Sequence, residues 1–244
     1  MVNGLYVAAS AMQAQTQNLD AIAGNLANLS TPGYKRDIPA FSAQLQYLLD
    51  NPPGSQPADT PMPEFVQPTI TIDLADGSLR RSDNPCDLAL QGPGFLVVRT
   101  PDGEAYTRSG ALTLDPDGNL ITHSGYPVLG DGGPISVTGD NWQVSAKGEV
   151  SVDGAVVGRL RLVEIPAESL RRIGDGLMLS TGEPTPLDWT KTEVRQGYLE
   201  LSNANAMWEM VSLIAAMRTF EANQRMVQAE DSTLDKAVNQ VGRV

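Results

Sequence analysis

Apolar side chains recur at every seventh position near the start of the chain, at Leu5, Met12, Leu19 and Leu26. Ile22 and Leu29 each follow three residues after a member of this series, which is the second seam position of a coiled coil. Residues 1–34 contain a single charge, Asp20, whereas a solvent-facing helix spreads charges over its outer face. The pattern predicts a helix that is packed on all sides within an assembly.

The end of the chain has the same period, with one seam series at Leu213, Phe220, Val227, Leu234 and Val241 and a second at Met210, Met217 and Val238. Gln224 and Asp231 interrupt the second series, and buried polar seam residues of this kind can fix the register of a coil. Two heptad helices at opposite ends predict that the termini pair. The alternative is that each helix merely covers a globular core.

The middle of the chain alternates short β runs with turns. Four Asp-Gly pairs, at residues 76–77, 102–103, 117–118 and 153–154, predict hairpins because both residue types accept positive φ. The even spacing indicates a sandwich or barrel-like β domain. We therefore expect an α+β protein with a helical assembly domain (1–34 and 203–244), an extended arm (35–69) and a central β domain (70–202), with Ser202 and Asn203 capping the last helix.

The expected arm is rich in proline, at residues 52, 53, 57, 61, 63 and 68. Proline favours an extended backbone and has no amide hydrogen to donate, so this segment is expected to run along a surface instead of folding as a unit.

Charge is unevenly placed along the chain. Residues 1–36 hold one acid and two bases, and residues 203–244 hold five acids and four bases, so the middle carries the whole net charge of -12. This distribution argues against a nucleic-acid or anionic-membrane partner, each of which would require a basic patch. No apolar run is long enough to span a membrane, and the start lacks the features of a cleaved secretory signal.

Catalytic chemistry has little support in the sequence. His123 is the only histidine and Cys86 the only cysteine, which leaves no zinc site of the usual ligands and makes a Ser-His-Asp triad on a turn-flanking histidine improbable. A calcium loop opening at Asp115 fails because its sixth and twelfth positions are Leu120 and Tyr126. We expect no enzyme activity, no metal and no cofactor. A β-sandwich hydrolase is the remote alternative.

Three strings resemble the signatures of bacterial flagellar rod, hook and hook-associated proteins. They are residues 25–36 (NLANLSTPGYKR), residues 85–95 (PCDLALQGPGF) with residues 105–110 (AYTRSG), and residues 197–205 (GYLELSNAN). Their order and their spread over nearly the whole chain make the resemblance specific. It marks Asn25, Asn28, Thr31, Pro32, Gly33 and Tyr34 as a junction motif that follows the first helix.

The resemblance implies a structural subunit of the basal-body rod. Length and a single modest β domain resemble a rod protein more than the hook, and residues 130–135 and 158–176 resemble the proximal-rod member more than the distal-rod member. It further implies export by the flagellar apparatus without a cleaved signal, assembly in the periplasm with copies of itself and other rod proteins, and a helical coiled-coil layer inside the β domains. A coiled-coil adhesin or adaptor is the alternative from another class.

Overall fold

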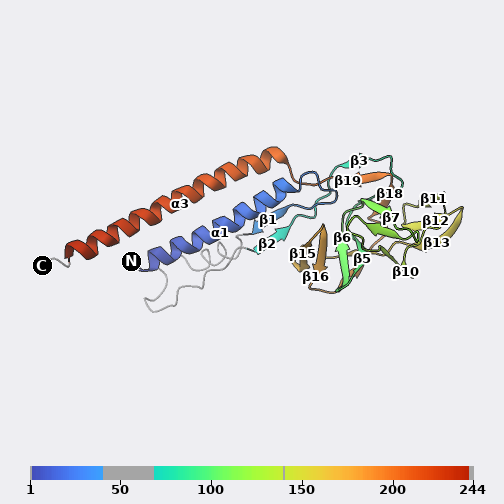
Figure 1. The fold of residues 1–244 in the computed structure, drawn as a ribbon, viewed down its shortest axis with the longest axis horizontal. Coiled ribbons are helices and arrows are strands. Elements are labelled where there is room, and N and C mark those ends of the chain that lie inside the picture. Colours follow the sequence, from blue (N-terminus) through green and yellow to red (C-terminus); the bar gives the residue numbers. More distant parts are fainter. Residues whose placement is uncertain (1, 41–68, 140, 242–244) are drawn as a thin grey trace. The chain divides into compact units, whose positions relative to one another are not determined.

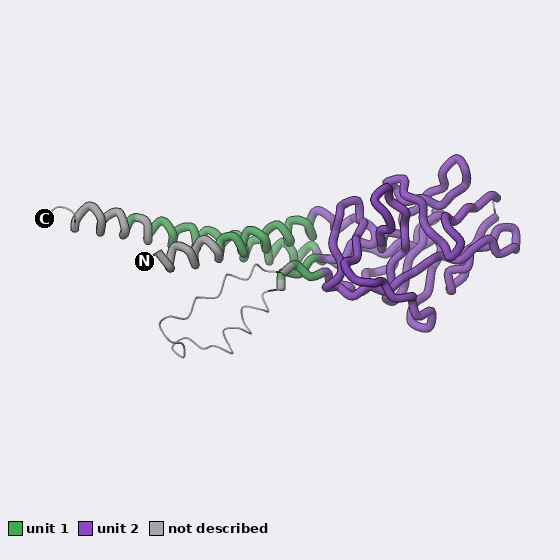
Figure 2. The backbone as a smooth tube through the Cα atoms, turned by 90° about the horizontal axis from the view of Figure 1, so that it is seen from below, with its two compact units in different colours: residues 1–26, 37–71, 206–244 green, residues 27–36, 72–205 purple. Residues whose placement is uncertain are grey.

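The computed structural model describes residues 2–40, 69–139 and 141–241. These form two compact units, coloured separately in Figure 2. The first unit contains residues 1–26, 37–71 and 206–244, and the second contains residues 27–36 and 72–205. We refer to them as the helical unit and the β unit. No helix within the described residues has the length and apolar character to cross a bilayer.

The helical unit is built from α1 (Val2–Ala27) and α3 (Ala206–Val241), which run side by side (Figure 1). The amide Nε2 of Gln15 donates a hydrogen bond to the Ala216 carbonyl oxygen over 2.9 Å, linking residues far apart in the sequence. Strands β1 (Asp37–Ala40) and β2 (Thr69–Ile72) pair as a two-stranded ribbon at the two ends of the expected proline-rich arm. Residues 41–68, between these two strands, lie outside the described residues.

The β unit contains short strands, as the turn spacing predicts. Their bounds are β3 (Leu79–Arg81), β4 (Leu88–Gln91), β5 (Phe95–Thr100), β6 (Gly103–Thr107), β7 (Leu112–Leu114), β8 (Leu120–Thr122), β9 (Leu129–Gly130), β10 (Gly133–Pro134), β11 (Trp142–Val144), β12 (Glu149–Val152), β13 (Ala155–Arg159), β14 (Leu162–Glu164), β15 (Leu170–Gly174), β16 (Leu177–Ser180), β17 (Thr185–Pro186), β18 (Glu193–Gln196) and β19 (Tyr198–Glu200), with a 3-10 turn, η1, at Ala167–Ser169.

The largest sheet among the described strands is antiparallel and has the order β15-β16-β6-β5-β14-β17. Strand β5 lies inside this sheet, and its side chains alternate between the two faces. Leu96 and Val98 belong to one buried apolar cluster, whereas Phe95 and Val97 belong to a second. Both faces are therefore covered, so β5 reads as a continuous apolar run instead of an alternating one.

Three of the four Asp-Gly pairs form the predicted hairpins, joining β5 to β6, β7 to β8 and β12 to β13. The prediction is wrong for Asp76 and Gly77, which lie in the connection between β2 and β3. Gly77 has no room for a side chain because a Cβ there would overlap the Leu201 carbonyl oxygen. Gly77 is thus required for close packing and not for a tight turn.

The predicted cap of the last helix is also wrong. Helix α3 begins at Ala206, three residues after Asn203, and the Asn203 side chain is engaged elsewhere. Its Nδ2 donates to the carbonyl oxygens of Asp73 (2.9 Å) and Ala75 (3.1 Å). The side-chain oxygen that an N-cap residue offers to helix amides accepts instead from the Arg36 amide over 2.7 Å.

Candidate functional site at the arm junction

The segment that follows α1 and the segment that precedes α3 are hydrogen-bonded to one another within the β unit. The Gly33 amide donates to the Glu200 carbonyl oxygen over 2.8 Å, and the Asn203 amide donates to the Tyr34 carbonyl oxygen over 3.3 Å. The Arg36 amide donates to Asn203 Oδ1 over 2.7 Å. We call residues 31–36 and 198–203 together the arm junction.

Gly33 is required at the centre of this junction for two reasons. Its φ of +69° lies in the left-handed region that costs little only for glycine. A Cβ at this position would also overlap the backbone of Arg108 and Ser109. The glycine of the first signature therefore lets the chain lie directly against the β unit.

Beneath the junction lies a buried network of charges centred on Glu200. Lys35 Nζ donates to Glu200 Oε1 over 2.7 Å, and Arg108 Nε donates to Glu200 Oε2 over 2.6 Å. The side chains of all three residues are only 2% exposed. The Gly77 amide also donates to Glu200 Oε1 over 2.8 Å, so both carboxylate oxygens have partners.

A second carboxylate balances the network. Arg108 Nη2 lies 3.1 Å from Asp76 Oδ1, and Lys35 Nζ lies 3.9 Å from the same oxygen, which gives two cations and two anions. The remaining donors reach backbone carbonyls, including Gly94 from Arg108 Nη1 over 2.6 Å. Burial, and next the neighbouring Arg108 charge, lower the pKa of Lys35, while Glu200 acts in the opposite direction.

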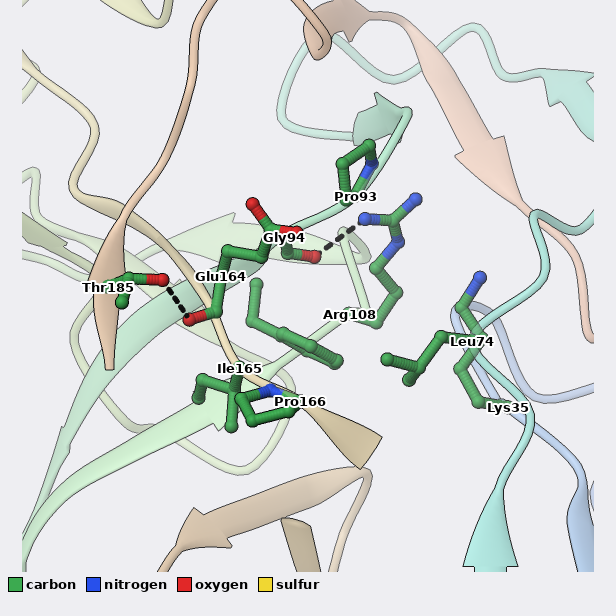
Figure 3. A pocket seen from close by; sticks show the side chains of 10 residues that line it. Lys35, Leu74, Pro93, Gly94, Arg108, Glu164, Ile165, Pro166 and Thr185 are labelled. Carbon is green, nitrogen blue, oxygen red and sulfur yellow. Dashed lines mark hydrogen bonds between the residues drawn. The ribbon is translucent and has the colours of Figure 1, made fainter. Parts of the chain in front are cut away.

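A cavity of about 240 Å³ adjoins the network (Figure 3). Its walls include Leu74, Phe95 and Ile165. The cations at its border, Lys35 and Arg108, are already neutralised by Glu200 and Asp76, so the cavity offers no net positive charge to an anion. Among the described residues, no cluster of His, Cys, Asp or Glu could hold a metal ion.

The structure brings most of the predicted junction motif into this site or next to it. Tyr34 is buried beneath the Arg172 guanidinium, which lies 4.4 Å from the ring centroid. Arg172 also donates to the Lys35 carbonyl oxygen over 2.7 Å. Thr31 Oγ1 donates to Asn28 Oδ1 over 3.1 Å in the turn after α1. Pro32 is half-buried beside Gly33.

Asn25 lies in the helical unit and connects α1 to β1. Its Nδ2 donates to the Asp37 carbonyl oxygen over 2.9 Å, and its Oδ1 accepts from the Asp37 amide over 2.8 Å. The side chain is buried. The two bonds hold the last turn of α1 against the first residue of the strand that follows.

The predicted seam residues are distributed over both helices. In α1 and just after it, Ile22 is buried, whereas Met12, Leu19, Leu26 and Leu29 are half-buried. In α3 the least exposed side chains are Glu209, Leu213, Ala216, Phe220, Asn223 and Val227, a seven-residue repeat. Met210 and Met217 lie outside this stripe and are 48% and 51% exposed. The side chains of Leu5, Leu234 and Val238 are outside the described residues.

The boundary of the β unit differs from the expected one, because residues 27–36 belong to it and β1 and most of β2 belong to the helical unit. Lys35 is therefore a buried part of the junction and not the start of an arm. Sequence reasoning missed Asp76, Arg108 and Glu200 as functional residues. The sequence did contain a usable signal. Arg108 is the only charged residue in the string 105–110, and Glu200 is the only one in the string 197–205.

Family models match three stretches of the chain. Residues 5–35 match "Flagella basal body rod protein", residues 89–152 match "Flagellar hook protein FlgE/F/G D1 domain", and residues 195–241 match "Flagellar basal body rod FlgEFG protein C-terminal". The first and third of these matches include the arm-junction residues 31–35 and 198–203. The chain belongs to the flagellar basal-body rod family. This family is structural and does not consist of enzymes.

Full-length relatives support the same assignment. The flagellar basal-body rod protein FlgG of Buchnera aphidicola subsp. Schizaphis graminum is 32% identical over 97% of this chain and 98% of its own length. FlgF of Rhizobium meliloti is 32% identical over 99% of both chains. FlgF of Escherichia coli is 33% identical over 97% of both. Relatives named FlgG and relatives named FlgF thus match this chain at nearly equal sequence identity.

Proposed function

We propose that this chain is a subunit of the proximal rod that assembles with copies of itself and with neighbouring rod proteins into a torque-transmitting tube across the periplasm. The arm junction carries the proposal. A subunit that transmits torque needs a stiff backbone beside its helices, and the segments that follow α1 and precede α3 are held to one another by the buried charges of Lys35, Arg108 and Glu200. In this proposal the chain is exported through the flagellar apparatus without a cleaved signal.

The helices are proposed to pair as a coiled coil on the inner side of the tube. The heptad stripe of α3 and the hydrogen bond from Gln15 to Ala216 support this pairing. The opposite face of α3 carries a second apolar stripe, formed by Met207, Met210, Val211, Ile214 and Met217, which are all exposed in the single chain. Contiguous apolar surface of this kind marks an interaction site, and we assign it to neighbouring subunits.

The proximal position rests on residues 130–135 and 158–176, whose pattern resembles the proximal-rod member. Its test is to locate the chain along the rod. Gly154 lies at the β12–β13 turn, where a Cβ would meet no atom within 4 Å, so a short epitope inserted there is expected to be tolerated. Immunogold labelling of isolated basal bodies should then mark the end of the rod nearest the inner membrane.

Labelling at the hook end of the rod would contradict the proximal assignment and favour the distal one. Labelling only outside basal bodies, on a small discrete oligomer, would instead favour the adhesin or adaptor alternative. Complementation of a deletion strain by the tagged chain is the control, because restored motility shows that the epitope has not displaced the subunit.

A further inference from the structure

We propose that two hairpin turns of the β unit, at Asp153 and Asp175, are modification sites at which isoaspartate forms. In each turn the main chain is transferred from the α-carboxyl to the side-chain carboxyl of the aspartate. The product is a substrate for a carboxyl methyltransferase that uses S-adenosylmethionine. The reaction depends on the two turns alone and not on the proposed rod function.

The dipeptide that undergoes this reaction, Asp-Gly, occurs six times in the sequence. Besides the four pairs named above, it is found at residues 131–132 and 175–176. Glycine leaves the peptide nitrogen uncovered in all six, because it has no Cβ. The backbone separates them, since Asp153 and Asp175, with φ of +50° and +52°, are the only non-glycine residues with positive φ in the described part of the chain.

Both aspartates occupy the first position of a two-residue hairpin turn. Strands β12 and β13 pair directly on either side of Asp153-Gly154, and β15 and β16 do so on either side of Asp175-Gly176. The two glycines also have positive φ, +85° and +70°, as a type I′ turn requires. Within the described residues, neither glycine amide donates a backbone hydrogen bond, so both nitrogens are available.

The reaction requires the glycine nitrogen to reach Cγ of the preceding aspartate. The nitrogen is eclipsed with Cβ when the aspartate has a ψ of about −120°, which is the value at the first central residue of a type II′ turn. A flip of the central peptide converts type I′ to type II′ while the φ of the aspartate stays positive. Glycine accepts the accompanying change in its own φ. Both turns are therefore one peptide flip away from the reactive geometry.

The atoms of the reaction balance without a further reactant. The glycine nitrogen loses its proton and bonds to Cγ, the carboxyl loses its hydroxyl group, and water leaves as a succinimide ring closes. Water then adds to one of the two ring carbonyls. Opening at the α-carbonyl leaves the chain linked through the side chain, and opening at Cγ restores aspartate. Both aspartates are exposed, so water reaches each ring.

Two of the other Asp-Gly pairs have a glycine amide that is already engaged. The Gly77 amide donates to Glu200 Oε1 over 2.8 Å, and the Gly118 amide donates to the Asp115 carbonyl oxygen over 3.0 Å. A Cβ at either glycine would also overlap a backbone carbonyl oxygen, which shows how closely each is packed. A peptide flip at these positions would break the bond and displace a packed neighbour.

The two remaining pairs lie in hairpin turns of another kind. Gly103 pairs with Thr100 across its turn, so its amide faces the closing hydrogen bond. The pair at Asp131 lies between β9 and β10, but this aspartate lacks the positive φ of the type I′ turns. A peptide flip there gives a type II turn, with a ψ of about +120°, which carries the nitrogen away from Cβ.

Peptide mapping of the purified full-length chain tests the proposal. The folded chain is held at neutral pH and body temperature for several weeks, and isoaspartate at each Asp-Gly pair is quantified by mass spectrometry with electron-transfer fragmentation. We expect the fractions at Asp153 and Asp175 to exceed those at the other four pairs by at least about tenfold. The same chain in concentrated urea is the control, in which all six pairs should react at similar rates.

Methyl transfer from S-adenosylmethionine by an isoaspartyl carboxyl methyltransferase gives a second measurement. The double variant Asp153→Glu and Asp175→Glu keeps both charges, but glutamate would have to close a larger, six-membered ring. It should lose most of the methyl acceptance that the aged parent acquires. The matched double variant Asp102→Glu and Asp117→Glu should retain it. Circular dichroism confirms that both variants are folded.

Equal isoaspartate at all six pairs of the folded chain would overturn the role of the turns, and so would a fraction at Asp131 as high as that at Asp153 and Asp175. Absence of isoaspartate from both turns, while the urea sample forms it, would show that the peptides do not flip and would also overturn the proposal. Motility is not a readout here, so the outcome is independent of the rod function.

Discussion

Lys35 and Glu200 lie 165 residues apart in the sequence, yet the Lys35 ammonium donates to the Glu200 carboxylate over 2.7 Å in the interior of the β unit. Transferring two charges from water into such a site is costly unless their hydrogen bonds are satisfied. Here Arg108 and the Gly77 amide complete the partners of the carboxylate. The ion pair therefore joins the segment that follows α1 to the segment that precedes α3.

Glu200→Gln should destabilise the β unit strongly. It leaves Lys35 and Arg108 as buried cations without their shared anion, and breaking a buried pair in this way costs about 3–5 kcal/mol. Urea unfolding followed by tryptophan fluorescence measures the change. Glu193→Gln is the matched control, because Glu193 is 63% exposed and pairs with Arg195 only at 3.8 Å, so its effect should stay within about 0.5 kcal/mol. Equal effects of the two substitutions would contradict the central role of Glu200.

Gly33→Ala should weaken the junction and impair assembly. The added Cβ meets the Arg108 backbone at a residue whose φ is +69°, and such strain costs on the order of 1–3 kcal/mol. Hydrogen exchange of the amides of residues 33–36 should become faster, and motility should fall. Gly132→Ala provides the comparison, since a Cβ there meets no atom within 4 Å. Slow exchange retained in Gly33→Ala would show that the close approach is not required.

Asp115 is expected to contribute a pH-dependent stability to the β7–β8 hairpin. Hydrogen bonds from the Asn119 side chain, and then from the Asn119 amide, lower the pKa of Asp115 below its ordinary value of 3.8. A lowered pKa means that the stabilisation is complete above pH 3.8 and is lost as the pH falls through the folded-state value.

Asp115→Ala should therefore lower the melting temperature at neutral pH, and the difference from the parent should shrink in acid. Asp117→Ala is the control, because its carboxylate has no hydrogen bond among those found in this turn while its amide donates to Asp115 Oδ1 over 2.9 Å. A melting-temperature difference for Asp115→Ala that persisted unchanged at pH 3 would exclude the ionised carboxylate as its source.

The sequence predicted correctly those elements that depend on the spacing of apolar residues and on turn-forming residue pairs. Heptad spacing predicted both terminal helices, and Asp-Gly pairs predicted the hairpins of β5–β6, β7–β8 and β12–β13. These features depend on local conformational preference and on the period of the apolar residues, both of which are present in a short window of sequence.

The buried network could not be predicted in the same way. Charged residues are usually exposed, so the default reading of Lys35, Arg108 and Glu200 is a solvated surface, whereas all three are buried. Only tertiary packing brings them together, from three segments far apart in the sequence. The wrong prediction that Asn203 caps the last helix has the same cause. Asn203 accepts a hydrogen bond from the Arg36 amide, and no local sequence pattern relates these two residues.

The exposed apolar stripe of α3 gives the most direct prediction for assembly. Ile214 lies at its centre and is 54% exposed in the single chain, so Ile214→Asp should leave the free energy of unfolding within about 0.5 kcal/mol of the parent. In an assembled rod the same aspartate would be buried without a partner, which is strongly unfavourable. We expect loss of motility and absence of the chain from purified basal bodies. Ile214→Leu keeps the apolar surface and should assemble normally. Normal motility of the Ile214→Asp strain would show that this face of α3 remains in solvent in the rod.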